Sequence, residues 1–266
     1  MEKKIFFIDF DGTLMRDDKT ISDKNREALR NAVDQGHYIA LATGRAVSSG
    51  RRIAKELELT RPGCYLVAYN GGTIYDFSAD CILSNKRLPI EYLLREATEA
   101  GIHIQTYSDT QVLAAERNKE LDFYVKKTGM PCRITGNLNS MLYEEPPKML
   151  LIDLEHKERL EAFQQAHAEW EKGKCSSFFS CKEYLEYCPL GANKGYGVEF
   201  LCDFLGVPIE NAVAIGDEEN DISMIRNAGV GVAMKNAVQS VKDAADYVTE
   251  HDNNEDGVAE VIEKFS

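Results

Sequence analysis

The residues with the clearest potential for chemistry are two carboxylates, Asp9 and Asp11, which follow the apolar run 5–8 and directly precede Gly12. A short run of β-branched and aromatic residues is typical of a buried strand. Residues i and i+2 of an extended chain face the same side, so the two acids leave the strand together. Open α/β folds bind ligands at the carboxyl edge of the sheet, and the pair therefore indicates an anionic metal site with one carboxylate available as a nucleophile. Taken alone, the same pair is equally typical of a solvated Asp-Gly turn.

Two further segments have groups suited to phosphate oxygens. Thr43 and Gly44 end the apolar run 38–42 and precede a segment, 47–57, that can be helical. A helix start offers free N–H groups and the positive end of a dipole, and Thr43 adds a hydroxyl donor, although an ordinary helix cap is the alternative. Lys194 lies ahead of an amphipathic helix at 198–205 and supplies a cation, whereas a lone lysine is usually solvated.

A second acidic loop follows the apolar run 212–215. It reads Gly-Asp-Glu-Glu-Asn-Asp from Gly216 to Asp221 and again lies at the end of a predicted strand. Asp217 and Asp221 are four residues apart where the chain enters a helix, so Asp221 can face back toward the site that Asp217 reaches.

With these four motifs in order, the chain resembles the haloacid dehalogenase superfamily of aspartate-nucleophile phosphatases, and in particular its Cof-like branch, over essentially its whole length. The resemblance implies an α/β fold with a doubly wound parallel-sheet (Rossmannoid) core and an inserted α+β cap. It makes Asp9 the nucleophile and Asp11 the general acid/base. The phosphate ligands that it implies are the backbone N–H of Phe10 with Thr43, Gly44, Lys194 and Asn220. The magnesium ligands are the carboxylates of Asp9 and Asp217 and the backbone carbonyl of Asp11, with Asp221 in support.

The expected function is a magnesium-dependent phosphatase that hydrolyses small phosphorylated metabolites, such as sugar phosphates, through an aspartyl phosphate. A phosphate dianion repels an attacking carboxylate unless cations neutralise the charge between them, and Mg²⁺ and Lys194 are those cations. Two alternatives remain at this point. A phosphomutase of the same superfamily shares the motifs but requires a bisphosphate activator. A non-catalytic phosphate-binding regulator would be expected to lack Asp9 or Asp11, and both are present.

The positions of the motifs also predict how the chain is divided. Residues 1–84 and 189–266 carry all four motifs and should form one discontinuous catalytic core, whereas 85–188 should be an inserted α+β cap that sets substrate specificity, with hinges near 84–86 and 189–191. Alternating strands and helices predict the parallel core sheet. The strands expected in the core are 4–9, 38–42, 64–69, 212–216, 230–233 and 246–249, with helices at 23–35 and 194–205. The insert should contain helices 89–100, 118–128 and 156–172 and strands near 102–107, 111–115, 148–153 and 176–187.

Four residues are weaker candidates for substrate contact. Arg45 adjoins the phosphate loop and either assists the anion or pairs outward. Asn70 follows the third strand and either reaches the substrate or only forms an Asn-Gly turn. Lys148 and Glu186 are polar residues in or beside strands of the insert, where either one facing the active site would contact substrate and a solvated position is the alternative.

Composition restricts the partners and the compartment. The chain of 266 residues has a formal net charge of −13, which argues against nucleic acid or an anionic membrane as a partner. No apolar run approaches the ~20 residues of a membrane span. The start of the chain becomes charged too soon for a signal peptide, and we expect a cytoplasmic protein. Seven cysteines without a Cys-x-x-Cys motif indicate free thiols in a reducing compartment. The expected partner is a small phosphorylated metabolite, and no motif specifies an oligomeric state.

Overall fold

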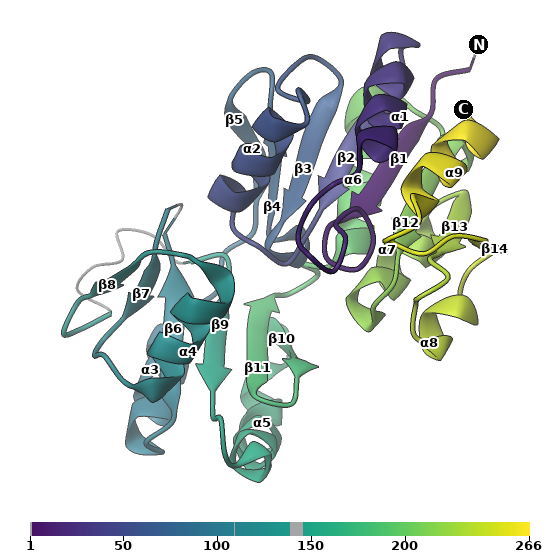
Figure 1. Cartoon of the computed structure of the whole chain (residues 1–266). Helices are drawn as coiled ribbons and strands as arrows, with labels where there is room; N and C mark the ends of the chain where they lie inside the picture. Colours follow the sequence, from purple (N-terminus) through teal and green to yellow (C-terminus); the bar gives the residue numbers. More distant parts are fainter. Residues whose placement is uncertain (1, 109, 139–145) are drawn as a thin grey trace. The chain divides into compact units, whose positions relative to one another are not determined.

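The computed structural model describes residues 2–108, 110–138 and 146–266 (Figure 1). The chain divides into two compact units. The first contains residues 1–84 and 193–266, and the second contains residues 85–192. The second crossing thus falls between Ala192 and Asn193, a few residues beyond the expected position of 189.

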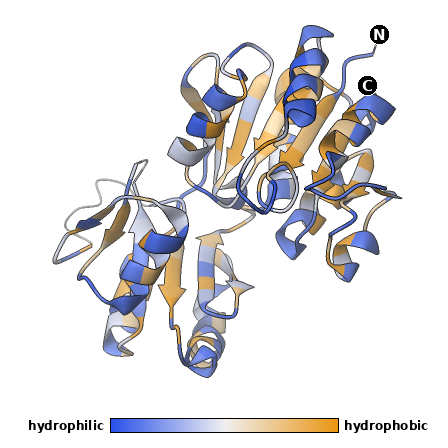
Figure 2. Ribbon diagram, in the orientation of Figure 1, coloured by the Kyte–Doolittle hydropathy of each residue, from blue (hydrophilic) through white to orange (hydrophobic). Residues whose placement is uncertain are grey.

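The first unit is built on an eight-stranded sheet in the order β14-β13-β12-β1-β2-β3-β4-β5. Its central strands are almost entirely buried and apolar, and they appear as the hydrophobic centre of the sheet in Figure 2. Continuous apolar runs of this kind are expected where helices cover both faces of a parallel sheet. The six parallel strands are β1 (Ile5–Asp9), β2 (Tyr38–Ala42), β3 (Cys64–Ala68), β12 (Ala212–Gly216), β13 (Val230–Ala233) and β14 (Tyr247–Val248).

The predicted parallel core sheet is present, and at one edge it continues into two strands that were not expected. Strands β4 (Thr73–Asp76) and β5 (Cys81–Asn85) extend the sheet beyond β3, and β4 pairs antiparallel with β3. The sheet is therefore mixed. The turn at Tyr69–Gly71 that reverses the chain between β3 and β4 is too short for a helical crossover, so β4 can only return antiparallel.

Helices flank this sheet, and some of them begin with a side-chain cap. Ser22 accepts a hydrogen bond from the N–H of Asn25 at the start of α1, and Asn193 accepts one from Tyr196 at the start of α6. Helix α1 contacts α9, and α6 contacts α7. The helices are α1 (Asp23–Asp34), α2 (Val47–Glu56), α6 (Lys194–Leu205), α7 (Ile222–Asn227), α8 (Gln239–Lys242) and α9 (Gly257–Phe265), with short 3₁₀ turns at Tyr69–Gly71, Ile209–Asn211 and Glu219–Asp221.

The second unit is a six-stranded sheet in the order β10-β11-β9-β6-β7-β8. Strand β8 was not expected, and the segment near 176–187 forms two antiparallel strands. The strands are β6 (His103–Tyr107), β7 (Val112–Ala114), β8 (Cys132–Ile134), β9 (Met149–Ile152), β10 (Cys175–Cys181) and β11 (Tyr184–Pro189), and the helices are α3 (Glu91–Glu99), α4 (Lys119–Thr128) and α5 (Lys157–Glu171).

The two faces of this second sheet differ in chemistry. On one face, an apolar cluster joins α3 and α5 to alternate strand residues, including Ile104, Leu151 and Leu185. Successive residues of a strand point to opposite faces, so Gln105 and Glu186 lie on the other face. None of the helices in the described part of the chain is long and apolar enough to cross a membrane.

Candidate active site

Five polar side chains meet at one edge of the first unit's sheet. Asp9 ends β1, Thr43 follows β2, Asp217 follows β12, and these three strands are neighbours in the sheet. Lys194 begins α6, and Asp221 ends the 3₁₀ turn that follows Asp217. All five are buried, with exposed fractions of 6% or less. The structure therefore brings together residues of all four motifs, three of them at strand ends.

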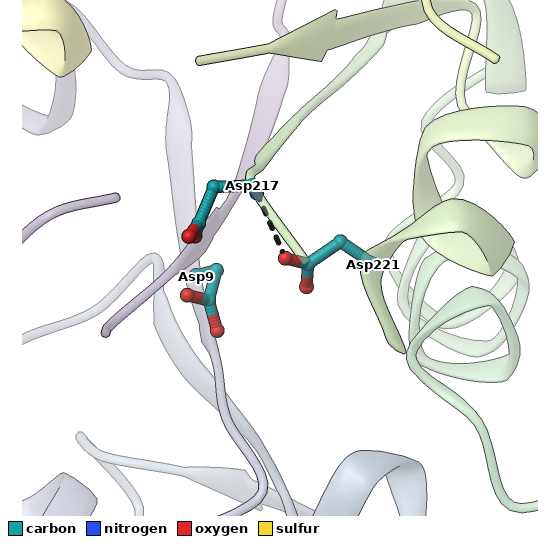
Figure 3. Close-up of side chains that lie close together, drawn as sticks. All are labelled: Asp9, Asp217 and Asp221. Carbon is teal, nitrogen blue, oxygen red and sulfur yellow. Dashed lines mark hydrogen bonds between the residues drawn. The ribbon is translucent and has the colours of Figure 1, made fainter. Parts of the chain in front are cut away.

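Three of these residues form a buried carboxylate cluster. Oxygen atoms of Asp9, Asp217 and Asp221 lie within 4.8 Å of one another (Figure 3). This is the one group of acids, cysteines or histidines in the described ranges that is compact enough to hold a metal ion. Carboxylate oxygens at this spacing are the ligand type that Mg²⁺ prefers.

Lys194 is the cation within this cluster. Its Nζ atom lies 2.5 Å from Oδ1 of Asp9 and 2.5 Å from Oδ1 of Asp221. The other oxygen of Asp221 accepts hydrogen bonds from the backbone N–H groups of Asp217 (3.0 Å) and Glu218 (3.1 Å). Both oxygens of Asp221 are thus engaged in fixing Lys194 and the loop. Asp9 and Asp217 are the members of the cluster better placed to take a metal.

The charges in the cluster do not balance. Burial raises the pKa of Asp9 well above its ordinary value, and Asp221 adds repulsion that Lys194 opposes. Burial also raises the pKa of Asp217 to about 7, against the hydrogen bond that it accepts from Thr13. Burial would lower the pKa of Lys194, but Asp221 and Asp9 outweigh it and raise that pKa. With all three acids deprotonated, one ammonium leaves an excess of negative charge, which fits a site for a divalent cation.

Asp11 is held apart from the cluster by two cations. Arg45 donates from Nε to Oδ2 at 2.9 Å and from Nη2 to Oδ1 at 2.5 Å, which is a bidentate pair, and Lys19 donates to Oδ1 at 3.2 Å. Burial would raise the pKa of Asp11, but Arg45 and Lys19 outweigh it and lower that pKa. Arg45, considered in the sequence as a substrate contact, is in this structure the partner of Asp11.

The residues predicted to bind phosphate are linked through Asn70. Asn220 donates to Oδ1 of Asn70 at 3.1 Å, and the N–H of Asn70 donates to the carbonyl of Thr43 at 3.0 Å. Asn70 has a left-handed backbone with φ 52° and ψ 41°, a conformation that is uncommon for residues other than glycine and that is often found at functional sites. A Cβ atom on Gly44 would lie only 3.1 Å from Oδ1 of Asn70. The candidate Asn70 therefore belongs to this site. The hydroxyl of Thr43 accepts the N–H of Arg45, as a turn cap does.

Two residues of the site were not predicted, although both lie in the first motif. The Thr13 hydroxyl donates to Oδ1 of Asp217 at 2.7 Å and is fully buried. Gly12 has φ +81°, and a Cβ atom there would lie 2.2 Å from Oδ2 of Asp217. The Asp-Gly-Thr run was a visible signal, but the partner is 204 residues away in the sequence. Lys148 and Glu186 belong to the second unit, where they pair with each other at 2.8 Å.

Comparison with known proteins agrees with this geometry. The family model described as haloacid dehalogenase-like hydrolase matches residues 6–262. Among curated proteins, the chain is 34% identical over 261 residues to the Bacillus subtilis 5-amino-6-(5-phospho-D-ribitylamino)uracil phosphatase YcsE, covering 97% of this chain and 94% of that protein. A crystal structure of a haloacid dehalogenase-like hydrolase from Bacteroides thetaiotaomicron is 32% identical, covers 100% of both chains and superposes with a TM-score of 0.92. The crystal structure of TM0651 from Thermotoga maritima is 31% identical, covers 99% of this chain and 98% of that one, and superposes with a TM-score of 0.88. The resemblance seen in the four motifs is confirmed, and the chain belongs to the haloacid dehalogenase-like hydrolase family, in its Cof-like branch.

Proposed function

We propose that this hydrolase is a magnesium-dependent phosphatase that acts on small phosphorylated metabolites, such as sugar phosphates, through an aspartyl phosphate on Asp9. The observation that carries the proposal is the buried cluster in which Lys194 bridges Asp9 and Asp221 beside Asp217. The name of the YcsE relative, a phosphatase of a phosphorylated ribityl compound, supports the same class of substrate.

The phosphate group would be bound by cations and by uncharged donors. Lys194 supplies the charge, while Asn220, the hydroxyl of Thr43 and the backbone N–H groups of Phe10 and Gly44 supply hydrogen bonds. Donors fixed in advance in a buried site stabilise the transferring phosphoryl group more strongly than they would in water. The link from Asn220 through Asn70 to Thr43 supports this role, because it fixes the positions of two of these donors relative to each other.

The residues present fit a magnesium ion. The carboxylates of Asp9 and Asp217 and the backbone carbonyl of Asp11 would hold it, and Asp221 would support the loop from behind. Bound there, Mg²⁺ would neutralise charge between the phosphate dianion and Asp9. The excess negative charge of the cluster supports this assignment, since one lysine does not balance three acids.

The two acids of the first motif would act in sequence. A carboxylate oxygen of Asp9 attacks phosphorus, the bond from phosphorus to the leaving oxygen breaks, and Asp11 donates its proton to that oxygen. Asp11, now a carboxylate, then takes a proton from the water that hydrolyses the aspartyl phosphate and so restores Asp9. The first role needs a protonated Asp11, which Arg45 and Lys19 oppose in this structure, so Asp11 must exchange these partners during turnover.

The direct test is hydrolysis of a generic aryl phosphate by the purified protein, without any bisphosphate activator. We expect turnover with Mg²⁺ and its loss in excess chelator, restored when Mg²⁺ is added back. Full activity in chelator would refute the metal assignment. We also expect the protein to work in the cytoplasm, a reducing compartment, because all seven cysteines are free thiols.

A further inference from the structure

The turn that follows β1 depends on contacts from distant parts of the chain. Gly12 has φ +81°, and a glycine gives the backbone wide conformational freedom, so local sequence does not fix the peptide between Asp11 and Gly12. The carbonyl of that peptide is the group of Asp11 that is proposed to bind magnesium. The affinity for the metal therefore depends on the contacts that hold this turn in place.

A short segment between β13 and α8, residues 234–238, contacts both loops that carry the proposed metal ligands (Figure 1). The backbone N–H of Val238 donates to the carbonyl of Asp217 at 3.0 Å. Two residues earlier, Nδ2 of Asn236 donates to the carbonyl of Gly12 at 2.8 Å. The segment thus joins the loop after β12 to the turn after β1.

A second asparagine holds the far end of the same turn. Asn253 lies between β14 and α9 and is only 3% exposed. Its Nδ2 atom donates to the carbonyl of Met15 and to Oδ1 of Asp17, both at 3.0 Å. Its backbone N–H donates to Oδ1 of Asn236 at 3.2 Å. The turn at 12–15 is therefore held at both ends by two asparagines that are bonded to each other.

Asn236 differs from Asn253 in being exposed. Water can replace the hydrogen bonds of an exposed side chain, so these bonds contribute little to the stability of the fold. The side chain nevertheless joins residues that are 224 and 17 positions away in the sequence. Its main physical consequence is to fix the separation between two loops, and contacts that orient metal ligands from outside have large effects on metal affinity.

We propose that Asn236 is a positioning residue of the metal site. By holding the carbonyl of Gly12, it sets the distance between the backbone carbonyl of Asp11 and the carboxylate of Asp217. This rests on the proposed function, which assigns those two groups to Mg²⁺. Magnesium demands a nearly ideal octahedral arrangement of its ligands, so a small displacement of one ligand lowers the affinity.

The test is a calorimetric titration of Mg²⁺ into the metal-free protein without substrate. In Asn236→Ala we expect Kd for Mg²⁺ to rise by about tenfold or more. The unfolding temperature in chelator should fall by only about 4 °C or less, because an exposed hydrogen bond is lost. The matched control is Gln239→Ala, which removes an exposed amide that donates to Asp243 at 2.7 Å and should leave Kd unchanged. An unchanged Kd in folded Asn236→Ala would overturn the inference while leaving the proposed function intact.

Asn236→Asp tests which hydrogen bond of the side chain matters. An aspartate keeps the acceptor for the N–H of Asn253 but, when ionised, has no donor for the carbonyl of Gly12. An added carboxylate would by itself strengthen the binding of a cation, so a higher Kd in this variant would have to come from the lost contact with Gly12. We expect that higher Kd, and a value equal to or below that of the wild type would overturn the inference. Absence of Mg²⁺ binding by the unmodified protein would instead refute the metal assignment itself, and this inference with it.

Discussion

Each of the two units buries a lysine in an ion pair, but the number of carboxylates beside the lysine differs. In the first unit, Lys194 is surrounded by three acids, whereas in the second, Lys148 has Glu186 as its partner in a neutral pair. An excess of negative charge in a buried place is a site that a divalent cation stabilises. A neutral pair has no such demand, but it offers a donor and an acceptor side by side. The difference in charge is the reason for proposing the metal site at the first cluster and none at the second pair.

We expect the largest difference between the two ion pairs, in both turnover and stability, when Lys194 or Lys148 is replaced. Lys194→Met should lower kcat by at least about 10²-fold, because one of the two cations proposed to face the phosphate is removed. It should also lower stability by about 3–5 kcal/mol, since buried carboxylates lose their partner. Thermal unfolding should show a larger stabilisation by Mg²⁺ in Lys194→Met than in the wild type.

Lys148→Met is the matched control for that measurement. It also leaves a buried carboxylate unpaired, so a similar loss of stability is expected, but Mg²⁺ should stabilise it only as much as it stabilises the wild type. A near-normal kcat in folded Lys194→Met would contradict the assigned role of Lys194. An equal rise in unfolding temperature on adding Mg²⁺ to the two variants would contradict the assignment of the metal to the first unit alone.

The next effect concerns stability and pH in the metal-free protein. The folded-state pKa of Asp217 is about 7, above its unfolded value of 3.8, so between these values the folded state binds more protons than the unfolded state. Stability of the metal-free protein should therefore fall as the pH rises from about 4 to about 7. Magnesium binds the deprotonated carboxylates, so its stabilising effect should grow over the same interval, reaching about 2.7 kcal/mol at a free concentration one hundred times Kd.

Unfolding midpoints at pH 5 and pH 8, each with chelator and with Mg²⁺, check this expectation. Asp217→Asn serves as the control, because it cannot titrate and should flatten the dependence. A magnesium effect that is equal at both pH values would contradict the assignment of Asp217 as a metal ligand.

A smaller effect is expected at Thr13. Thr13→Val keeps the shape of the side chain but removes its hydrogen bond to Asp217, so the proposed metal ligand loses one positioning contact. Loss of an outer contact of this kind typically costs about 10–100-fold in metal affinity or activity. The apparent Mg²⁺ activation constant should rise, while Thr20→Val, a substitution at an exposed threonine, should leave it unchanged. An unchanged constant in Thr13→Val would show that Asp217 is held by its other contacts.

Part of the candidate active site could be predicted from local sequence. Asp9, Thr43 and Asp217 could be found because each directly follows an apolar strand, and parallel strands place such residues on one edge. The antiparallel β4 was missed because strand direction depends on the turn at Tyr69–Gly71 rather than on strand composition.

Contacts between distant segments could not be predicted from local sequence. Thr13 meets Asp217, and Arg45 meets Asp11, only after the sheet order has brought their loops together. The sequence identifies Lys148 and Glu186 only as polar residues in or beside strands, and their pairing depends on β9 lying beside β11. The sequence pattern predicts the side on which a residue lies, and the topology of the sheet decides its partner.

In the proposed mechanism, Asp9 carries the phosphoryl group and Asp11 moves the protons. Asp11→Asn retains the nucleophile but cannot activate water for the second step, so incubation with an aryl phosphate and Mg²⁺, rapid quench and mass analysis should show phosphate accumulated on Asp9. Asp9→Asn should show neither turnover nor attached phosphate. Phosphate found on another residue, or turnover by Asp9→Asn together with no phosphoenzyme in Asp11→Asn, would contradict the roles assigned to the two acids.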